Sequence, residues 1–593
     1  MEKVLIVVGA ILLIAAAIEV GPRVHVPGAL LLVVIGSAIG LIPPVPEVHI
    51  DPEWILVGVL PPLLYSAAVQ MPTMDFRRDF RAISALSVLL VVISAFLLGA
   101  FFWMVLPGIG LATGVALGAI VSPTDAVATG IAKRLGVPSR VIAVLQGESM
   151  LNDASALVLL RAAVAAMAAS ISFGGVVVNF GFAVVVAVLI GGFVGWLNLR
   201  VRARIRDAAV STAISFTVPY LAYLPTEELG ASGLVAAVTA GLVTGAGAVG
   251  HLTPSHRISD TQNWHMVEMI AEGGVFLLMG LELWGLLRDV HRDHDGILHA
   301  VWLGLAALAV IVVIRAIWMV PMVWWLERSR RRGDAIRPML ENYTVTPTAG
   351  SGDAPNVVRR KLSRWKWRAR FTRSRTPAEL PAVSPETAVR INARITRALA
   401  DLDYYDDAPL GAKEGAILVW AGMRGVVTLA AAQTLPEDTP ERPLLVLTAF
   451  VVAAASLLLQ AGTLPWLIRS LRLPDRTATD IAERKALRAA LDRLAQEVMA
   501  TSVKVQEVPW LRARIEQATR EAEESDDGVG GGATTGLSFA DRAEVRKVRR
   551  EIIKAQRDEL LNLRREGNYS SAALSRMLKQ LDAEELALYP QTG

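Results

Sequence analysis

The sequence predicts an all-α polytopic membrane protein with about 13 transmembrane helices, inverted repeats and a cytoplasmic helical tail. The chain of 593 residues is 53% hydrophobic and 19% charged, which is too apolar for a soluble domain. Apolar runs of about 20 residues, long enough to cross a bilayer, alternate with short polar loops. Positive charges gather in every second loop, as they do on the cytoplasmic side of membrane proteins.

Hydrophobicity divides the chain into four regions. Residues 1–326 form a membrane body with spans 1 to 11, and residues 411–470 add spans 12 and 13. Residues 327–410 are a polar, basic insertion, and residues 471–593 are a polar tail with a flexible linker near 526–537. Within the tail, helical periodicity covers 477–524 and 538–587. The expected spans are approximately 3–20, 27–44, 53–72, 82–107, 111–133, 139–168, 172–197, 208–225, 231–250, 266–287, 299–326, 411–434 and 441–470.

The basic loops predict the orientation in the membrane. They contain Arg23, Arg77, Arg78, Arg81, Lys133, Arg134, Arg140, Arg200, Arg202, Arg204, Arg206 and Arg257. The intervening loops have almost no positive charge, with Arg288 and Arg292 as the exception. This bias places the N-terminus outside the cell and both the insertion and the tail in the cytoplasm. The chain has no cysteine, which excludes disulfides, thiolate metal sites and cysteine nucleophiles.

Two spans are expected to be broken at their centres. In span 5, Pro123 lies two residues before Asp125 within an apolar run, and proline interrupts helical hydrogen bonding. In span 12, Gly422 and Gly425 flank Arg424. Spans 4 to 6 and 11 to 13 therefore form corresponding triplets with a broken middle helix, the pattern of inverted repeats with an ion site at their crossing. Charges of opposite sign at the two breaks would compensate the helix ends there.

Span 6 contains most of the polar chemistry. Ser149 and Asp153 share one helix face, and Glu148 and Asn152 share the adjacent face. Oxygen ligands of this kind suit a hard monovalent cation, and a buried carboxylate suits a proton equally. An inert buried hydrogen-bond cluster is the alternative interpretation. Arg315 in span 11 needs an acidic partner inside the membrane, and we expect Glu148 to be that partner.

Seven motifs, taken in order, resemble monovalent cation/proton antiporter family 1, which includes NhaP-type bacterial sodium/proton antiporters and animal sodium/proton exchangers. They are SPTDAVA at 122–128, GESMLND at 147–153, ASGLVAAVTAGL at 231–242, FLLMGLEL at 276–283, IRA at 314–316, GMRGVVTLA at 422–430 and LPWLIRSLRL at 464–473. The resemblance covers essentially the whole membrane body. It implies a secondary active transporter, not an enzyme, that exchanges sodium for protons across the cell membrane, contributes to pH homeostasis and needs no cofactor.

The resemblance also implies roles for individual residues. Asp153 would alternately bind the cation and the proton. Its neighbour Asn152 would be neutral, and an Asn-Asp pair is associated with electroneutral exchange. Thr124, Asp125 and Ser149 would line the monovalent cation site together with Asp153.

Three further residues would have structural roles in this comparison. Glu148 and Arg315 would form an ion pair, and Arg424 would lie at the helix crossing. The resemblance implies a homodimer and an elevator-like movement of a six-helix ion-binding bundle, which makes exchange a form of alternating access.

Span 3 departs from the family pattern, because Ser66 stands where many members have an acidic residue. Potassium/proton exchange is therefore the main alternative to sodium, lithium is a further candidate ion, and a gated cation channel is less favoured.

Other classes of partner and activity have weaker support. The basic segment 359–375 interleaves arginine and lysine with Trp365 and Trp367, which favours contact with anionic lipid headgroups over nucleic acid. We therefore expect the lipid bilayer and a second copy of the chain as partners, and no nucleic acid. An intramembrane aspartyl protease is disfavoured because neither membrane aspartate lies in a Gly-x-Gly-Asp pattern.

Overall fold

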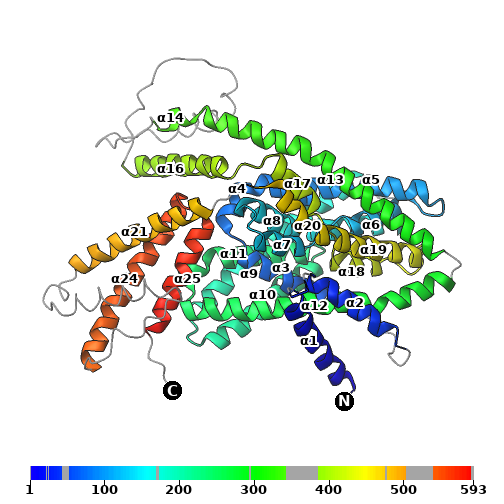
Figure 1. The fold of residues 1–593 in the computed structure, drawn as a ribbon, viewed down its shortest axis with the longest axis horizontal. Coiled ribbons are helices and arrows are strands. Elements are labelled where there is room, and N and C mark those ends of the chain that lie inside the picture. The colour runs from blue at the N-terminus through cyan, green and yellow to red at the C-terminus, as the bar shows by residue number, and fades with distance from the viewer. Residues whose placement is uncertain are drawn as a thin grey trace. The chain divides into compact units, whose positions relative to one another are not determined.

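The computed structural model describes residues 2–588 except 22, 25, 43–52, 169–172, 293–295, 342–384, 474–476 and 502–538. Every regular element in these described residues is a helix (Figure 1). The chain forms two compact units, of which one contains Met1–Val323 with Leu410–Arg476 and the other contains Trp324–Pro409 with Thr477–Gly593. The predicted all-helical class is therefore confirmed.

The first unit contains the apolar helices. Eight helices of the described chain are long and apolar enough to cross a membrane, and four shorter apolar helices accompany them. Each predicted span coincides with one helix or with consecutive helices, while the number of 13 crossings stays a prediction. The elements are α1 (Glu2–Val20), α2 (Gly28–Gly40), η1 (Trp54–Val59), α3 (Leu60–Gln70), α4 (Thr73–Ser84), η2 (Ala85–Leu89), α5 (Leu90–Val105), α6 (Leu111–Val121), α7 (Val127–Arg134), α8 (Ser139–Ala168), α9 (Phe173–Arg202), α10 (Ala208–Glu228), α11 (Gly233–His251), α12 (Pro254–Arg292), α13 (Ile297–Asp334), α17 (Ala412–Trp420), α18 (Val426–Gln433), α19 (Arg442–Ser456), η3 (Leu457–Ala461) and α20 (Gly462–Leu471).

Both predicted helix breaks are present. The chain leaves the helical conformation between α6 and α7, and again between α17 and α18. The backbone N–H of Asp125 in the first break donates to the carbonyl of Met423 in the second at 2.7 Å, so the two breaks cross. We call α4–α8, α13 and α17–α20 the bundle, which comprises the two triplets with broken middle helices. The remaining apolar helices, α1–α3 and α9–α12, are called the scaffold.

Small residues allow the scaffold helices to approach closely. Added Cβ atoms on Gly191 and Gly195 of α9 would overlap the backbone of α11, the second at 2.7 Å from the carbonyl oxygen of Ala240. The spacing of four residues puts both glycines on one face, as in the small-xxx-small pattern of membrane helix pairs. Helix α11 meets α3 through glycines in the same way.

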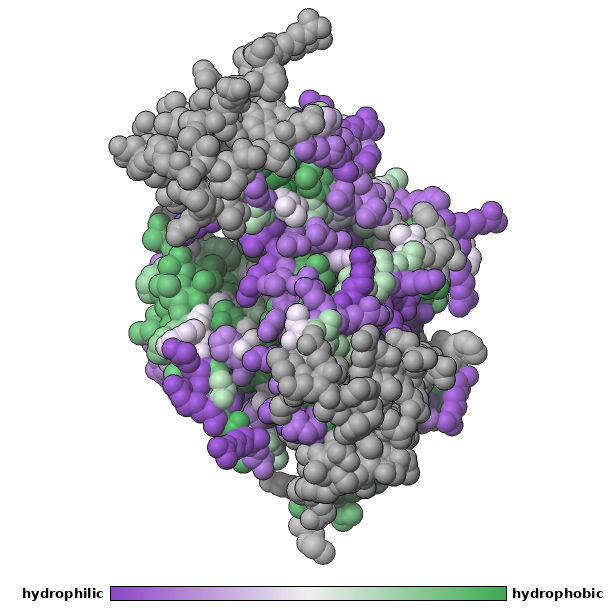
Figure 2. All heavy atoms as spheres, turned by 90° about the vertical axis from the view of Figure 1, so that its left-hand side faces the viewer, coloured by the Kyte–Doolittle hydropathy of each residue, from purple (hydrophilic) through white to green (hydrophobic). Residues whose placement is uncertain are grey.

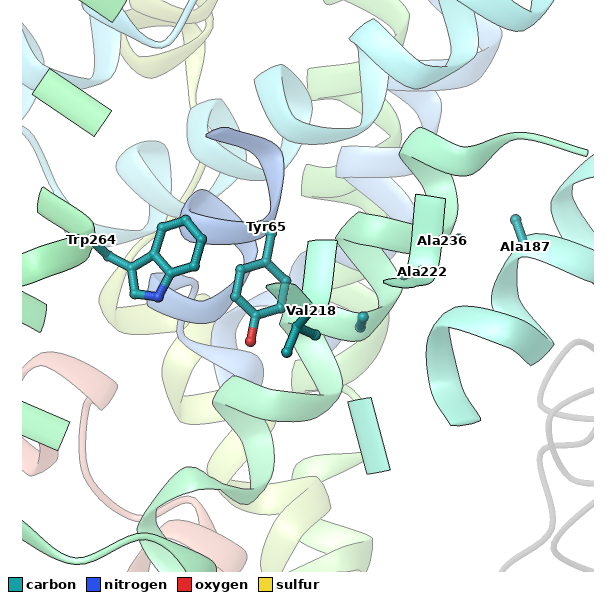
Figure 3. Close-up of a cluster of buried hydrophobic side chains, with 7 residues drawn as sticks. Tyr65, Ala187, Val218, Ala222, Ala236 and Trp264 are labelled. Carbon is teal, nitrogen blue, oxygen red and sulfur yellow. The ribbon is translucent and has the colours of Figure 1, made fainter. Parts of the chain in front are cut away.

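A buried cluster joins α3, α9, α10, α11 and α12 inside the scaffold (Figure 3). The rings of Tyr65 on α3 and Trp264 on α12 lie with their centroids 5.2 Å apart. The indole N–H of Trp264 donates to the hydroxyl of Ser215 on α10 at 3.0 Å, which satisfies a polar group that would be costly to bury alone. The scaffold is therefore tied together by contacts among its own helices.

Helix α9 continues into a segment that the charge pattern places in a cytoplasmic loop. Arg202 lies within the helix and is buried, so the prediction of a loop at this residue is wrong. Its Nη2 donates to Asp260 Oδ2 at 2.5 Å, and its Nε donates to Ser211 Oγ at 2.9 Å. Asp260 is available because α12 begins at Pro254, twelve residues before the expected start of span 10. A neutralised arginine is compatible with a buried helix, whereas an isolated one is not.

The second unit contains the polar helices α14 (Arg337–Glu341), α16 (Pro385–Asp407), α21 (Thr477–Thr501), α24 (Phe539–Glu566) and α25 (Ser571–Ala587). Figure 2 shows many hydrophilic described residues on the face in view, together with hydrophobic residues along one edge. The helical periodicity predicted over 538–587 corresponds to two helices, α24 and α25, with a turn between them. Gly567 has φ 84°, a conformation that glycine adopts readily, and Ser570 caps α25. The predicted linker near 526–537 and the basic segment 359–375 lie outside the described residues.

Candidate ion-binding site

The first break places Asp125 at the beginning of α7. Its Oδ1 accepts a hydrogen bond from the backbone N–H of Val127 at 3.3 Å. A carboxylate is favourable here because the N-terminal end of a helix has unpaired donors and a positive dipole end. Among the described residues, Asp125 Oδ2 is buried without a hydrogen-bond partner. One oxygen therefore holds the helix end, and the other is available to a ligand.

The second break places Arg424 against the end of α6. Its Nε donates to the carbonyl of Val121 at 3.0 Å, and its Nη1 donates to the carbonyl of Gly422. A cation is favourable at this position because the last carbonyls of a helix carry the negative dipole end. Ser456 on α19 holds the break itself by accepting from the backbone N–H of Arg424 at 2.8 Å. The sequence did not indicate a role for Ser456, although it is a polar residue in the apolar run of span 13.

The glycines of the second break make room for charged side chains. A Cβ on Gly425 would overlap the carboxylate of Asp125, and a Cβ on Gly422 would lie 2.6 Å from Arg315 Nε. Sequence reasoning identified these glycines as helix breakers. Their second function, close approach to the two charges, depends on tertiary contacts that no local pattern indicates.

Glu148 on α8 and Arg315 on α13 form a bidentate ion pair. The Nη1–Oε1 distance is 2.5 Å and the Nη2–Oε2 distance is 2.7 Å, and both side chains are buried. Arg315 Nε also donates to the carbonyl of Leu418 near the end of α17 at 2.8 Å. Paired hydrogen bonds of this kind offset the cost of removing two charges from water. The pair therefore ties α8, α13 and α17 together.

Thr124 and Asn152 extend this network to the first break. Asn152 Nδ2 donates to Thr124 Oγ1 at 2.5 Å, and Thr124 Oγ1 donates to Glu148 Oε1 at 3.3 Å. A cavity lies beside the network, lined by Leu86, Leu90, Val91, Ser94, Ser122, Glu148, Asn152, Arg315 and Arg424. The Glu148 and Asn152 face of α8 is therefore occupied by structural hydrogen bonds.

Asp153 lies on the neighbouring face of α8 and has a different environment. Asp153 is 7% exposed, and in the part of the chain that the structure describes its carboxylate has no hydrogen bond and no ion pair. Asp125 is close enough to act on it electrostatically, and Ser149 is half-buried one turn earlier. An isolated carboxylate inside a membrane protein costs several kcal/mol unless a proton or a cation neutralises it. Asp153 is therefore suited to bind either ion.

A further carboxylate near the site was not singled out from the sequence. Glu272 on α12 is close enough to Asp125 for the two charges to interact, although it belongs to the scaffold. The sequence shows it as one of three acidic residues inside span 10, but no local pattern indicated which helix it faces.

Residues 9–340, more than half of the chain, match the family model described as sodium/hydrogen exchanger, transmembrane. The chain belongs to this family. The exchanger is 27% identical over 603 residues to an uncharacterised Na(+)/H(+) exchanger of Mycobacterium tuberculosis, with 98% of the exchanger and 96% of the relative covered. It is 38% identical over 251 residues to an uncharacterised Na(+)/H(+) exchanger of Escherichia coli, with 41% and 46% covered.

A solved structure has the same fold. The sodium proton antiporter MjNhaP1 from Methanocaldococcus jannaschii aligns with 79% of the exchanger and 99% of its own chain, at a TM-score of 0.54 and 15% identity. The family is one of membrane transporters, so the exchanger is a multi-pass protein of the lipid bilayer. It exchanges sodium ions for protons, and the potassium/proton alternative is not favoured.

Proposed function

We propose that the exchanger works by alternating access, with sodium and the proton competing for Asp153. The observation that carries this proposal is a buried carboxylate beside the crossing of two broken helices, for which the described residues provide no ion-pair partner. Either ion neutralises this carboxylate, whereas the empty charged form is disfavoured inside the membrane. If the bundle moves only when Asp153 is occupied, the gradients of the two ions become coupled.

The surrounding residues divide into two roles in this proposal. Thr124, Asp125 and Ser149 supply further oxygen ligands for the monovalent cation. Glu148, Arg315 and Arg424 hold the helix crossing without exchanging ions themselves, which is supported by their dense hydrogen bonding within the bundle.

We infer an electroneutral exchange of one sodium for one proton. Asn152 has no charge and is hydrogen-bonded to Thr124, so Asp153 is the member of the Asn-Asp pair whose charge changes. If Asp125 keeps one charge state throughout the cycle, each sodium that binds replaces one proton.

The cellular setting of this activity also belongs to the proposal. The basic loops support a plasma-membrane protein with an external N-terminus and with the insertion and tail in the cytoplasm. There the exchanger would act as a homodimer in pH homeostasis, and the segment 359–375 would contact anionic lipid headgroups.

The test uses full-length protein in proteoliposomes that contain a pH-sensitive dye, with the membrane voltage clamped. We expect added sodium to drive proton movement in the wild type and not in Asp153→Asn, because the amide is neutral without a proton. The matched control Asp438→Asn makes the same chemical change at an exposed residue and should exchange normally. Sodium-driven proton movement in Asp153→Asn would contradict the assignment of the carboxylate.

The same assay separates the alternatives. A response to potassium alone would identify a potassium/proton antiporter. Ion current without proton movement would identify a channel. Dependence of the wild-type rate on voltage would contradict electroneutral exchange.

A further inference from the structure

The side-chain hydrogen bonds between the described residues of the bundle and the scaffold include two in which a scaffold carboxylate is the acceptor. Arg161 on α8 donates through Nη1 to Glu227 Oε2 on α10 at 2.6 Å. Gln433, the last residue of α18, donates through Nε2 to Glu282 Oε2 on α12 at 2.6 Å. In both contacts the donor belongs to the bundle and the carboxylate acceptor belongs to the scaffold.

Topology places both contacts at one end of the membrane body. Helix α8 begins at Ser139 in a basic loop and reaches Arg161 after about six turns, at the opposite end of the span. Glu227 and Gln433 lie at the ends of α10 and α18. The segments that follow α8, α10 and α18 contain no lysine or arginine before the next helix. The positive-inside rule therefore assigns both contacts to the external side.

One residue of each contact is also hydrogen-bonded to a neighbouring helix of its own group. Glu227 Oε1 accepts from the backbone N–H of Gly233 at 2.8 Å, which joins α10 to the start of α11. The carbonyl of Gln433 accepts from Arg442 Nη2 at 2.8 Å, which joins the end of α18 to α19. The contacts therefore connect secondary structure elements that are fixed on each side, so relative movement of the two groups must break them.

Exposure distinguishes the ion pair at this boundary from three pairs that join different helices inside one group. The Arg161 and Glu227 side chains are 52% and 23% exposed. The pairs Asp79–Arg140 and Glu148–Arg315 join helices within the bundle, Arg202–Asp260 joins helices within the scaffold, and all three are largely buried. Breaking a buried pair leaves an uncompensated charge, whereas breaking a partly exposed pair costs little.

We propose that Arg161–Glu227 and Gln433–Glu282 form an external clasp that closes one side of the bundle and scaffold boundary and opens in every transport cycle. The proposal rests on the alternating-access function above, because only movement of the bundle against the scaffold requires such a contact to break. The buried pairs persist through the cycle, and the partly exposed pair separates.

The test is to prevent the clasp from opening. The natural chain has no cysteine, so paired cysteines can be introduced into the full-length protein without removing any. Arg161→Cys/Glu227→Cys, joined by a short bifunctional maleimide, should lose sodium-driven proton movement, whereas the same variant before cross-linking should exchange. The control Thr212→Cys/Ser259→Cys links α10 to α12 within the scaffold, where the two hydroxyls lie 3.1 Å apart, and should exchange before and after cross-linking.

Undiminished exchange in the cross-linked Arg161→Cys/Glu227→Cys variant would overturn the clasp. If Asp153→Asn is inactive in the same assay, the proposed function still stands, so the two failures are distinguishable. Gln433→Cys/Glu282→Cys tests the second contact by the same procedure.

A single substitution provides a test that does not depend on cross-linking. Arg161→Gln should lower the external sodium concentration for half-maximal exchange by up to about fivefold, because weakening a partly exposed pair favours the externally open state. Arg161→Lys keeps the charge and should restore the wild-type value. An unchanged half-maximal concentration in Arg161→Gln would contradict the proposal.

Discussion

At the residue scale, the geometry of the ion site depends on the absence of a side chain. Gly425 lies so close to Asp125 that a single methyl group would overlap the carboxylate. The local sequence indicates a helix break at this glycine, but not the partner that approaches it. The role of a glycine in a tertiary contact can be read only when the second helix is in place.

We expect Gly425→Ala to abolish exchange, because the added Cβ displaces Asp125 from the N-terminal end of α7. Sodium-driven proton movement in proteoliposomes measures the effect. Gly462→Ala is a matched control, since a Cβ there meets nothing within 4 Å. Wild-type exchange in Gly425→Ala would show that Asp125 does not need its present position.

The buried pair of Glu148 and Arg315 makes a prediction about stability. Glu148→Gln should destabilise the protein by about 3–5 kcal/mol, because it leaves Arg315 charged and uncompensated inside the bundle. Thermal unfolding in detergent should show a clear loss of melting temperature. Glu19→Gln removes one partner of an ion pair in which both side chains are 72% exposed, and it should have little effect. Equal melting temperatures for the two variants would contradict a structural role of the buried pair.

Sequence reasoning located this pair but not every member of the site. An arginine and a glutamate in separate apolar spans each require a partner, so their pairing followed from the cost of burying a charge. Ser456 holds the second break through its hydroxyl, but serine is common in membrane helices and carries no such requirement. The contacts of buried charged residues can be predicted, because burying an unpaired charge costs much free energy. The contacts of a buried serine cannot, because its burial costs little.

At the element scale, helix interruptions were more predictable than helix ends. Pro123 and the glycines around Arg424 disrupt the backbone by local chemistry, and the structure has breaks at both positions. The ends of α9 and α12 were misjudged because Arg202 and Asp260 neutralise each other across two helices. Charged residues mark loops only when no partner lies within reach.

Helix packing by small residues leads to a prediction at this scale. Gly191→Val should separate α9 from α11 and lower the melting temperature, because its Cβ would overlap the backbone at Ala236. Gly192→Val, one residue along the same helix, meets nothing within 4 Å and should be tolerated. The two variants carry the same substitution at adjacent positions of one helix, so they differ mainly in what the new side chain contacts. Similar melting temperatures for both variants would show that this helix interface is not tightly packed.

At the scale of the whole molecule, the chain combines an apolar unit with a polar one. Hydropathy predicts this division, and the described chain clusters into two compact units, Met1–Val323 with Leu410–Arg476 and Trp324–Pro409 with Thr477–Gly593. The functions of the insertion and tail could not be derived, since amphipathic helices of mixed charge are compatible with many partners. Function could be predicted for the apolar unit because charged groups there are few and each requires a reason.

The backbone hydrogen bond between Asp125 and Met423 has an evolutionary consequence. It joins a backbone amide to a backbone carbonyl, so of the substitutions at positions 125 and 423 themselves only proline at 125 deletes a partner. Mutational drift at these two positions can therefore alter the chemistry beside the ion without dismantling the crossing. Relatives that differ in ion selectivity can therefore share the same crossing of the two helix breaks.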